Sequence, residues 1–337
     1  MSLFDLPIDE LRDFRPERDE ADDFDAFWES TLNDSRAARW PTRFEPAHPE
    51  LRALEVFDVT FAGFEGQAIK GWLIMPRQRA GRLPVVVEYI GYGGGRGLPS
   101  FWLTWAAAGY ANFIMDTRGQ GSAWVPGDTP DHDPEGSEPQ VAGFLTRGIM
   151  HPRRSYYRRV YTDAVLAIAA AREHPAVDPE RVVLAGGSQG GGIALAATAL
   201  DGTAVASCID VPFLCHFRRA SEITDDAPYS EIRSYLSVHR TRTEQVFRTL
   251  SYVDGMNLAA RARTPALFSV GLMDTICPPS TVFAAYNHYE GAKEISVWPW
   301  NGHDAGTIQQ VHERLDYLTR LGIVPPGADR SDSPSTT

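Results

Sequence analysis

Residues 181–200 read RVVLAGGSQGGGIALAATAL, and this stretch decides the expected fold. A short apolar run ends in GGSQG at 186–190, and small and aliphatic residues follow. This order predicts a buried strand, a very tight turn and a helix packed close to a sheet. A serine at the tip of such a turn is strained and exposes its hydroxyl, and glycines flank it because side chains there would collide. Ser188 is therefore a candidate nucleophile, and a purely structural turn is the alternative.

The composition bounds the class of protein. The chain has 337 residues, 43% of them hydrophobic, which is ample for a sizeable core. Asp and Glu number 44 against 32 Lys and Arg, which argues against nucleic acid or a membrane surface as a partner. The acidic N-terminus lacks the layout of a signal peptide, and no apolar run is long enough for a membrane span. The 3 cysteines show no C-x-x-C pair, so we expect a cytoplasmic protein without a metal site or cofactor.

Apolar runs and helical periodicities alternate through most of the chain. We expect strands at 54–60, 68–75, 84–89, 111–115, 182–184, 204–213, 266–270 and 294–300, and helices at 22–32, 102–108, 157–173 and 307–321. The alternation predicts an α/β fold with a doubly wound, mostly parallel sheet. Residues 216–263 are helical and charged in pattern, which predicts a helical insertion before the late strands. We expect a single domain over 1–324 and a disordered tail at 325–337.

A loop at residues 124–140 is rich in Pro, Gly and acidic side chains. Its acidic and imidazole groups resemble a metal cluster and lie at positions 128, 131, 132, 133 and 135. Their spacing is irregular, and Pro130 and Pro134 interrupt it. The sequence therefore predicts a solvated surface loop here.

A serine nucleophile needs a base, and the base needs an orienting carboxylate. Loops at the ends of later strands supply Asp274 and His303, and parallel sheets gather such loops at one edge. The chain order Ser188, Asp274, His303 is that of the α/β-hydrolases. Asp304 and Asp254 are alternatives for the acid. Asp304 is adjacent to His303, so its side chain should diverge, and Asp254 lies inside the insertion.

Two backbone amides are candidates for holding a developing oxyanion. One is the amide of Gln189, directly after the nucleophile, and the other is that of Tyr92, in the glycine-rich loop after strand 84–89. The glycines at 91 and 93–95 allow close approach to substrate, and a simple tight turn is the alternative. With the glycines at 190–192, they favour a shallow acyl site that selects acetyl groups.

The triplet Arg118, Gly119, Gln120 also follows a strand end near Ser188. We expect these residues to hold the loops in place, and direct contact with substrate is the alternative.

Several motifs resemble the cephalosporin C deacetylase and acetyl xylan esterase family, carbohydrate esterase family seven. The resemblance runs from about residue 22 to residue 321. It includes FDAFW at 24–28, the loop at 91–92, RGQ at 118–120, GFLTRGI at 143–149, YYRRVYTDAV at 156–165, GGSQGGG at 186–192, PFLCHFRRA at 212–220 and GLMDTICPPST at 271–281.

The resemblance implies an α/β-hydrolase fold with Ser188 as nucleophile, Asp274 as acid and His303 as base. It implies oxyanion donors at Tyr92 and Gln189 and a homohexameric assembly. The implied reaction is removal of acetyl groups from short acetylated xylo-oligosaccharides and from cephalosporin C, through an acyl-enzyme.

The chain departs from the family pattern at three positions. Asp304 stands where the family usually has Glu after the histidine, and the change is expected to alter the support around His303. His216 stands where the family usually has Asp, which bears on substrate details. Ile90 stands where the family usually has His before Gly-Tyr.

Other functions remain open from the sequence. A general short-chain carboxylesterase or a peptidase of the same fold is one alternative, although such a peptidase usually carries a large extra domain. A non-catalytic binding protein on this scaffold would be expected to lack Ser188, Asp274 or His303, and all three are present.

Overall fold

The computed structural model describes residues 3–131 and 141–327, and within them nine strands form one sheet. The strand order is β1-β2-β3-β5-β4-β6-β7-β8-β9. Neighbours from β1 to β5 pair antiparallel, and those from β5 to β9 pair parallel. The strands span Arg43–Ala47 (β1), Leu54–Ala62 (β2), Ala68–Pro76 (β3), Leu83–Tyr89 (β4), Ala111–Met115 (β5), Val177–Gly187 (β6), Ala206–Asp210 (β7), Ala266–Gly271 (β8) and Lys293–Trp298 (β9).

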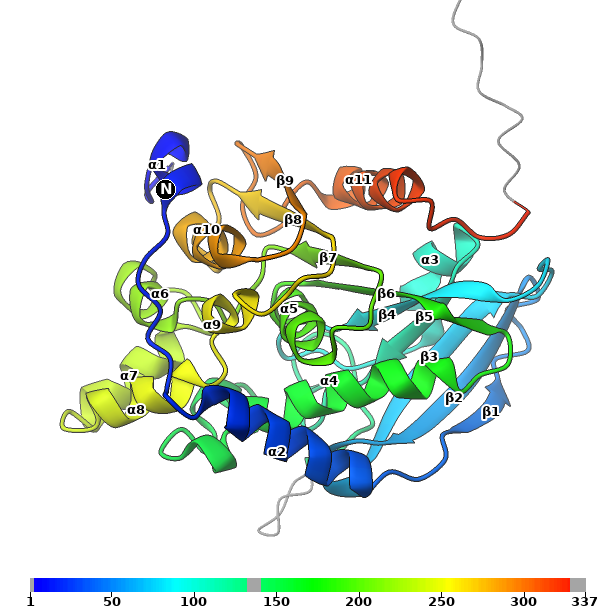
Figure 1. The fold of residues 1–337 in the computed structure, drawn as a ribbon, viewed down its shortest axis with the longest axis horizontal. Helices are drawn as coiled ribbons and strands as arrows, with labels where there is room; N and C mark the ends of the chain where they lie inside the picture. Colours follow the sequence, from blue (N-terminus) through cyan, green and yellow to red (C-terminus); the bar gives the residue numbers. More distant parts are fainter. Residues whose placement is uncertain (1–2, 132–140, 328–337) are drawn as a thin grey trace, which may run out of the picture.

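Helices cover both faces of the sheet (Figure 1). They span Ile8–Asp13 (α1), Phe24–Ala37 (α2), Leu103–Ala107 (α3), Tyr156–Arg172 (α4), Gln189–Asp201 (α5), Phe217–Ile223 (α6), Ser230–Val238 (α7), Thr243–Ser251 (α8), Gly255–Ala259 (α9), Pro279–His288 (α10) and Thr307–Arg320 (α11). Val85 and Val87 of β4 join the apolar cluster that includes α4 and α5. Val86 points the other way and packs with Trp105 of α3 and Leu318 of α11. Burial on both faces explains why the central strands are continuous apolar runs.

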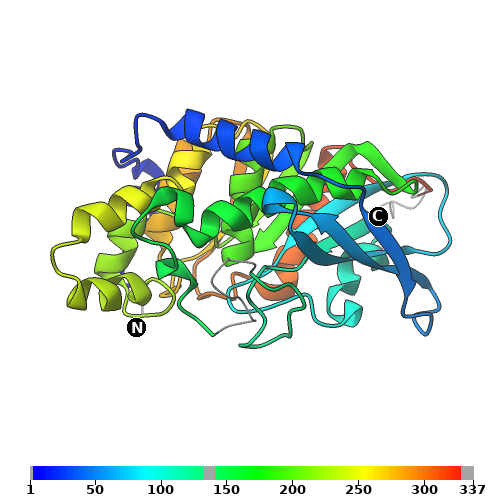
Figure 2. The same ribbon diagram turned by 90° about the horizontal axis from the view of Figure 1, so that it is seen from below.

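The helical insertion and the antiparallel strands lie at opposite ends of the molecule (Figure 2). Helices α6 to α9 follow β7 and precede β8, and the structure shows no strand in residues 216–263. Helix α2 lies along α4 (Figure 1) and buries Phe27 and Trp28. The Trp28 indole N–H donates to the Tyr252 carbonyl at 2.9 Å, so α2 ties the insertion to the body of the fold.

The α/β prediction with a mostly parallel sheet is confirmed, but the strand expected at 204–213 is shorter. It ends at Asp210 because Val211 has a φ of 35° and Pro212 has no N–H to donate. Helices α1 and α10 and strand β1 were not predicted. Strand β1 contains Pro46 and lies at the sheet edge, where proline is tolerated.

The single domain over residues 1–324 remains a prediction. Of the tail expected to be disordered, residues 328–337 lie outside the described part. Within the described residues, no helix is long and apolar enough to cross a membrane.

Candidate active site

Ser188 is the only residue between β6 and α5, and its backbone is strained. It has φ 58° and ψ −121°, a region that L-residues rarely occupy. Its N–H donates to the Asp210 carbonyl, and its carbonyl accepts from the N–H groups of Gly192 and Phe213, all at 3.0 Å. A Cβ at Gly186 would lie 2.3 Å from the backbone of Gly190. The turn therefore requires glycine, and its hydrogen bonds hold the serine in place.

The structure brings the three proposed catalytic side chains together at the ends of β6, β8 and β9. Ser188 Oγ lies 2.9 Å from His303 Nε2, and His303 Nδ1 lies 2.8 Å from Asp274 Oδ2. The other oxygen of Asp274 accepts the N–H groups of Ile276 and Cys277 at 2.9 Å each. Asp274 is fully buried, whereas the His303 side chain is 27% exposed. The arrangement can move a proton from the serine to the imidazole.

The loop after β4 presents Tyr92 with its backbone restrained on both sides. The Tyr92 carbonyl accepts the indole N–H of Trp124 at 2.9 Å, and the next amide, that of Gly93, donates to Gln120 Oε1 at 2.7 Å. Gln189, the other proposed donor, is the first residue of α5, and amides in a first helical turn have no acceptor within the helix. Both amides are thus on restrained backbone.

A pair of buried carboxamides joins the two loops. Gln120 Nε2 donates to Gln189 Oε1 at 2.8 Å, and Gln189 Nε2 donates to Gln120 Oε1 at 3.1 Å and to the Ile90 carbonyl at 3.1 Å. The hydroxyl of Tyr157 donates to Gln189 Oε1 at 2.9 Å, and that of Tyr156 accepts from Gln120 at 3.0 Å. These contacts link the loop after β4 to the first turn of α5. The sequence did not predict a role for these two tyrosines, although they open the motif YYRRVYTDAV at 156–165.

Arg118 lies fully buried beneath the loops. Its guanidinium binds both oxygens of Asp163, at 2.5 and 2.7 Å, and approaches Asp131 at 3.4 Å. Asp131 also pairs with Arg159 at 2.6 Å. Gly119 has φ 69°, and a Cβ there would lie 2.9 Å from the Asp131 side chain. Gly119 thus allows the loop to pass close to this ion-pair cluster.

Asp131 corrects the prediction of a solvated loop at 124–140. Asp131 and Thr129 are buried, because arginines neutralise the carboxylate and Thr129 donates its hydroxyl to Asp116 at 2.9 Å. Asp128 is exposed, as predicted for this loop, and pairs with Arg96 at 2.7 Å. The other positions of the supposed cluster, from 132 onward, lie outside the described residues.

Replacing Arg118 with methionine is expected to destabilise the fold by about 3–5 kcal/mol, because Asp163 would remain buried without its cation. Urea unfolding measures the change. The matched control is Arg181→Met, which breaks a partly exposed pair with Asp178 and should cost about 1 kcal/mol or less. Equal losses for the two variants would contradict the structural role of Arg118.

The glycines around the turn serve close packing of the chain on itself. A Cβ at Gly94 would lie 2.3 Å from the Trp124 ring, and one at Gly190 would lie 2.1 Å from the Tyr89 carbonyl. Similar clashes below 2.6 Å exist at Gly95, Gly191 and Gly192. These glycines therefore let the backbone pack closely on itself, and the shallow acyl site expected from them remains a prediction.

The family model of acetyl xylan esterases matches residues 1–321. The chain belongs to the acetyl xylan esterase family. It is thereby a member of the carboxylic ester hydrolases. The acetyl xylan esterase from Paenibacillus sp. R4 is 37% identical, with a TM-score of 0.85 over 94% of this chain and 99% of that one. The enzyme from Thermoanaerobacterium sp. is 30% identical, with a TM-score of 0.84 over the same shares.

Two more distant proteins are also similar, one in sequence and one in structure. The acetyl esterase Axe7A of Xylanibacter ruminicola is 28% identical over 295 residues, which are 83% of this chain. The match spans 63% of Axe7A, so this chain covers less than two thirds of that relative. An α/β-hydrolase from Penicillium sp., at 20% identity and a TM-score of 0.53, shares the fold alone. The protein therefore has the α/β-hydrolase fold.

Two departures from the esterase family pattern have local explanations. Asp304 is exposed and accepts from the Asn301 side chain at 2.7 Å and from the Gly302 N–H at 3.1 Å. It shapes the turn before His303 and does not contact the imidazole. Ile90 is buried in an apolar cluster, and it reaches the site only through the carbonyl that accepts from Gln189.

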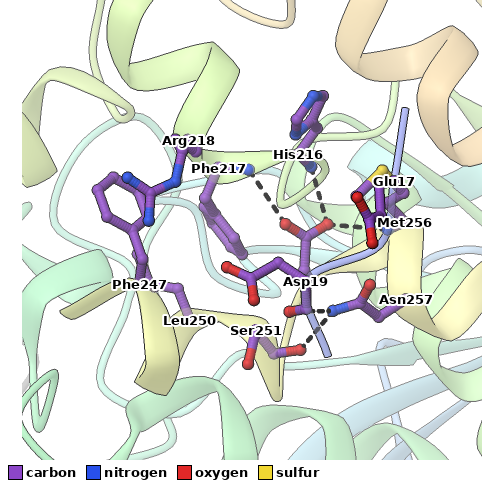
Figure 3. A pocket seen from close by; sticks show the side chains of 11 residues that line it. Glu17, Asp19, His216, Phe217, Arg218, Phe247, Leu250, Ser251, Met256 and Asn257 are labelled. Atoms are coloured by element: carbon purple, nitrogen blue, oxygen red, sulfur yellow. Dashed lines mark hydrogen bonds between the residues drawn. The ribbon is translucent and has the colours of Figure 1, made fainter. Parts of the chain in front are cut away.

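The third departure, His216, lines a cavity of about 120 Å³ beside the insertion (Figure 3). His216 has φ 48°, a conformation that Asp, Asn and His adopt more readily than most residues. Its N–H donates to Asp254, the rejected candidate for the acid, at 2.8 Å. Asp254 also accepts from Phe217 and Met256, at 3.1 and 2.9 Å, and burial raises its pKa to about 6. Asp254 thus organises the N-termini of α6 and α9 through these three amides.

Cys277 adds a thiol to the site that the sequence did not suggest. Among the described residues, Asp274, Cys277 and His303 place ligand-type atoms within 4.8 Å of one another. Burial raises the pKa of the Cys277 thiol. Asp274 and His303 are also bonded to each other, so the group fits a metal poorly.

Proposed function

We propose that this protein is a serine esterase that removes acetyl groups from small acetylated sugars, such as short xylo-oligosaccharides, and from acetates of the cephalosporin C type. The hydrogen-bonded series from Asp274 through His303 to Ser188 carries the proposal. The family supports acetyl esters as the substrate class. The cytoplasmic location and homohexameric assembly expected from the sequence remain predictions.

In the proposed mechanism, Ser188 Oγ attacks the ester carbonyl while His303 Nε2 takes its proton. Asp274 holds the imidazole in the required tautomer and stabilises its charged form. The amides of Tyr92 and Gln189 donate to the oxyanion of the tetrahedral intermediate. The alcohol then leaves with the proton from His303, and acetyl-Ser188 remains. Water deprotonated by His303 releases acetate and restores the serine.

The match to a family of acetyl xylan esterases, together with the shallow acyl site predicted from the sequence, makes a steep preference for short acyl chains the expected specificity. Each added methylene that fits gains only about 0.8 kcal/mol, whereas one that does not fit must displace packed atoms. We therefore expect kcat/KM to fall sharply from p-nitrophenyl acetate to butyrate and octanoate, which share one leaving group. Equal rates for the octanoate and acetate esters would instead identify a general carboxylesterase, and the assignment of the catalytic residues would not change.

A further inference from the structure

One carboxylate in the insertion reaches the loop that carries Tyr92. Glu231, in the first turn of α7, accepts the Tyr92 hydroxyl at 2.5 Å and the Gly143 N–H at 3.0 Å on one oxygen. Its other oxygen accepts the Leu145 N–H at 3.1 Å. The Tyr92 hydroxyl itself accepts the Phe144 N–H at 3.0 Å. Three segments far apart in the chain therefore meet at this side chain.

The Tyr92 ring is held as firmly as its hydroxyl. It meets Phe144 and Phe213 edge-on, with ring centroids 5.5 and 5.9 Å apart. The backbone of the same residue is restrained through Trp124 and through the following amide. A shift of the phenol would therefore pull on the Tyr92 peptide group, whose N–H is the proposed oxyanion donor.

We propose that Glu231 is a positioning residue for the oxyanion site: it anchors the Tyr92 phenol and so aims the Tyr92 N–H at the developing charge. This inference rests on the proposed function, in which Tyr92 supplies that donor. A carboxylate suits the task because it accepts several hydrogen bonds at once and binds them more tightly than a neutral group does. The insertion thus contributes to the reaction without contacting the substrate.

The test replaces Glu231 with glutamine. The carboxamide keeps the shape of the side chain. Its NH2 group, however, must face either the Leu145 N–H or the Tyr92 hydroxyl and Gly143 N–H. In both orientations one donor points at another, and a hydrogen bond that the carboxylate accepted is lost. Losing an oxyanion donor outright costs about 10²–10³ in kcat. A donor that is only loosened should cost less, and we expect kcat for p-nitrophenyl acetate to fall roughly tenfold with KM little changed.

A second variant and a matched control make the result specific. Tyr92→Phe removes the same hydroxyl, so it should lose a similar factor, and the double variant should lose little more because the two changes break one interaction. Glu222→Gln, an exposed position on α6 in the same insertion, should behave like the wild type.

Inhibitor binding separates positioning from a purely structural role. Methylboronic acid forms a tetrahedral adduct with a serine, and its Ki should rise by the factor by which kcat/KM falls. Xylobiose resembles the deacetylated product and contains no acyl carbonyl, so its Ki should not change. Unchanged kcat in Glu231→Gln, or equal weakening of both inhibitors with a lowered Tm, would overturn the inference. Failure of the proposed function would appear separately, as full activity in Ser188→Ala.

Discussion

Ser188→Ala is expected to lose nearly all ester hydrolysis while the fold stays intact. Without Oγ, no acyl-enzyme forms, and only substrate binding and the oxyanion donors remain, which supply roughly 10³-fold over water. Alanine removes a single atom, and the backbone hydrogen bonds of the turn do not involve Oγ. Initial rates with p-nitrophenyl acetate, together with the far-ultraviolet circular dichroism spectrum, measure the two parts of this expectation.

The control for this variant is Ser100→Ala, at an exposed serine that precedes α3. It should retain full activity. Wild-type rates in Ser188→Ala would rule out the serine mechanism. An inactive wild-type protein would instead favour the non-catalytic binding protein that the sequence left open.

Asp274→Asn is expected to lower kcat by about 10⁴. The N–H groups of Ile276 and Cys277 both donate to one oxygen of Asp274, so the asparagine oxygen should take that place. Its NH2 group would then face His303 Nδ1 and donate to it. The imidazole proton would move to Nε2, where the ring cannot accept the proton of Ser188.

Two neighbouring carboxylates serve as controls for that assignment. Asp304→Asn changes an exposed turn residue and should cost less than about tenfold. Asp254→Asn should affect the stability of the insertion more than the reaction. The rates are compared as kcat over the pH range of activity. If Asp274→Asn kept a near-normal kcat while Asp304→Asn or Asp254→Asn was inactive, the inactivated position would be assigned as the acid instead of Asp274.

The sequence predicts best where structure depends on neighbours along the chain. The turn at Ser188 is such a case, because an apolar run and closely spaced glycines specify a strand, a tight turn and a helix locally. The order of Ser188, Asp274 and His303 along the chain further predicts that the three strand ends that carry them lie close together. The strand–helix alternation then indicates a mostly parallel sheet, which the structure confirms.

The sequence predicts least where distant side chains decide. Glu231 and Tyr92 are 139 positions apart, and nothing in either local pattern indicates that they pair. Asp131 looks like a surface acid in its loop, yet arginines from α4 and from beneath the loops make its burial tolerable. Gly94 looks like a substrate-facing glycine, but the Trp124 ring already occupies the space above it.

The strained backbone at Ser188 has an evolutionary consequence. A φ of 58° with ψ near −121° costs a serine on the order of 1–3 kcal/mol, whereas glycine adopts such angles readily. Mutation and selection for folding alone would therefore favour glycine at the position where the chemistry needs a hydroxyl. A lineage that no longer used the reaction would gain stability by losing this side chain, so the serine persists only while its hydroxyl is useful.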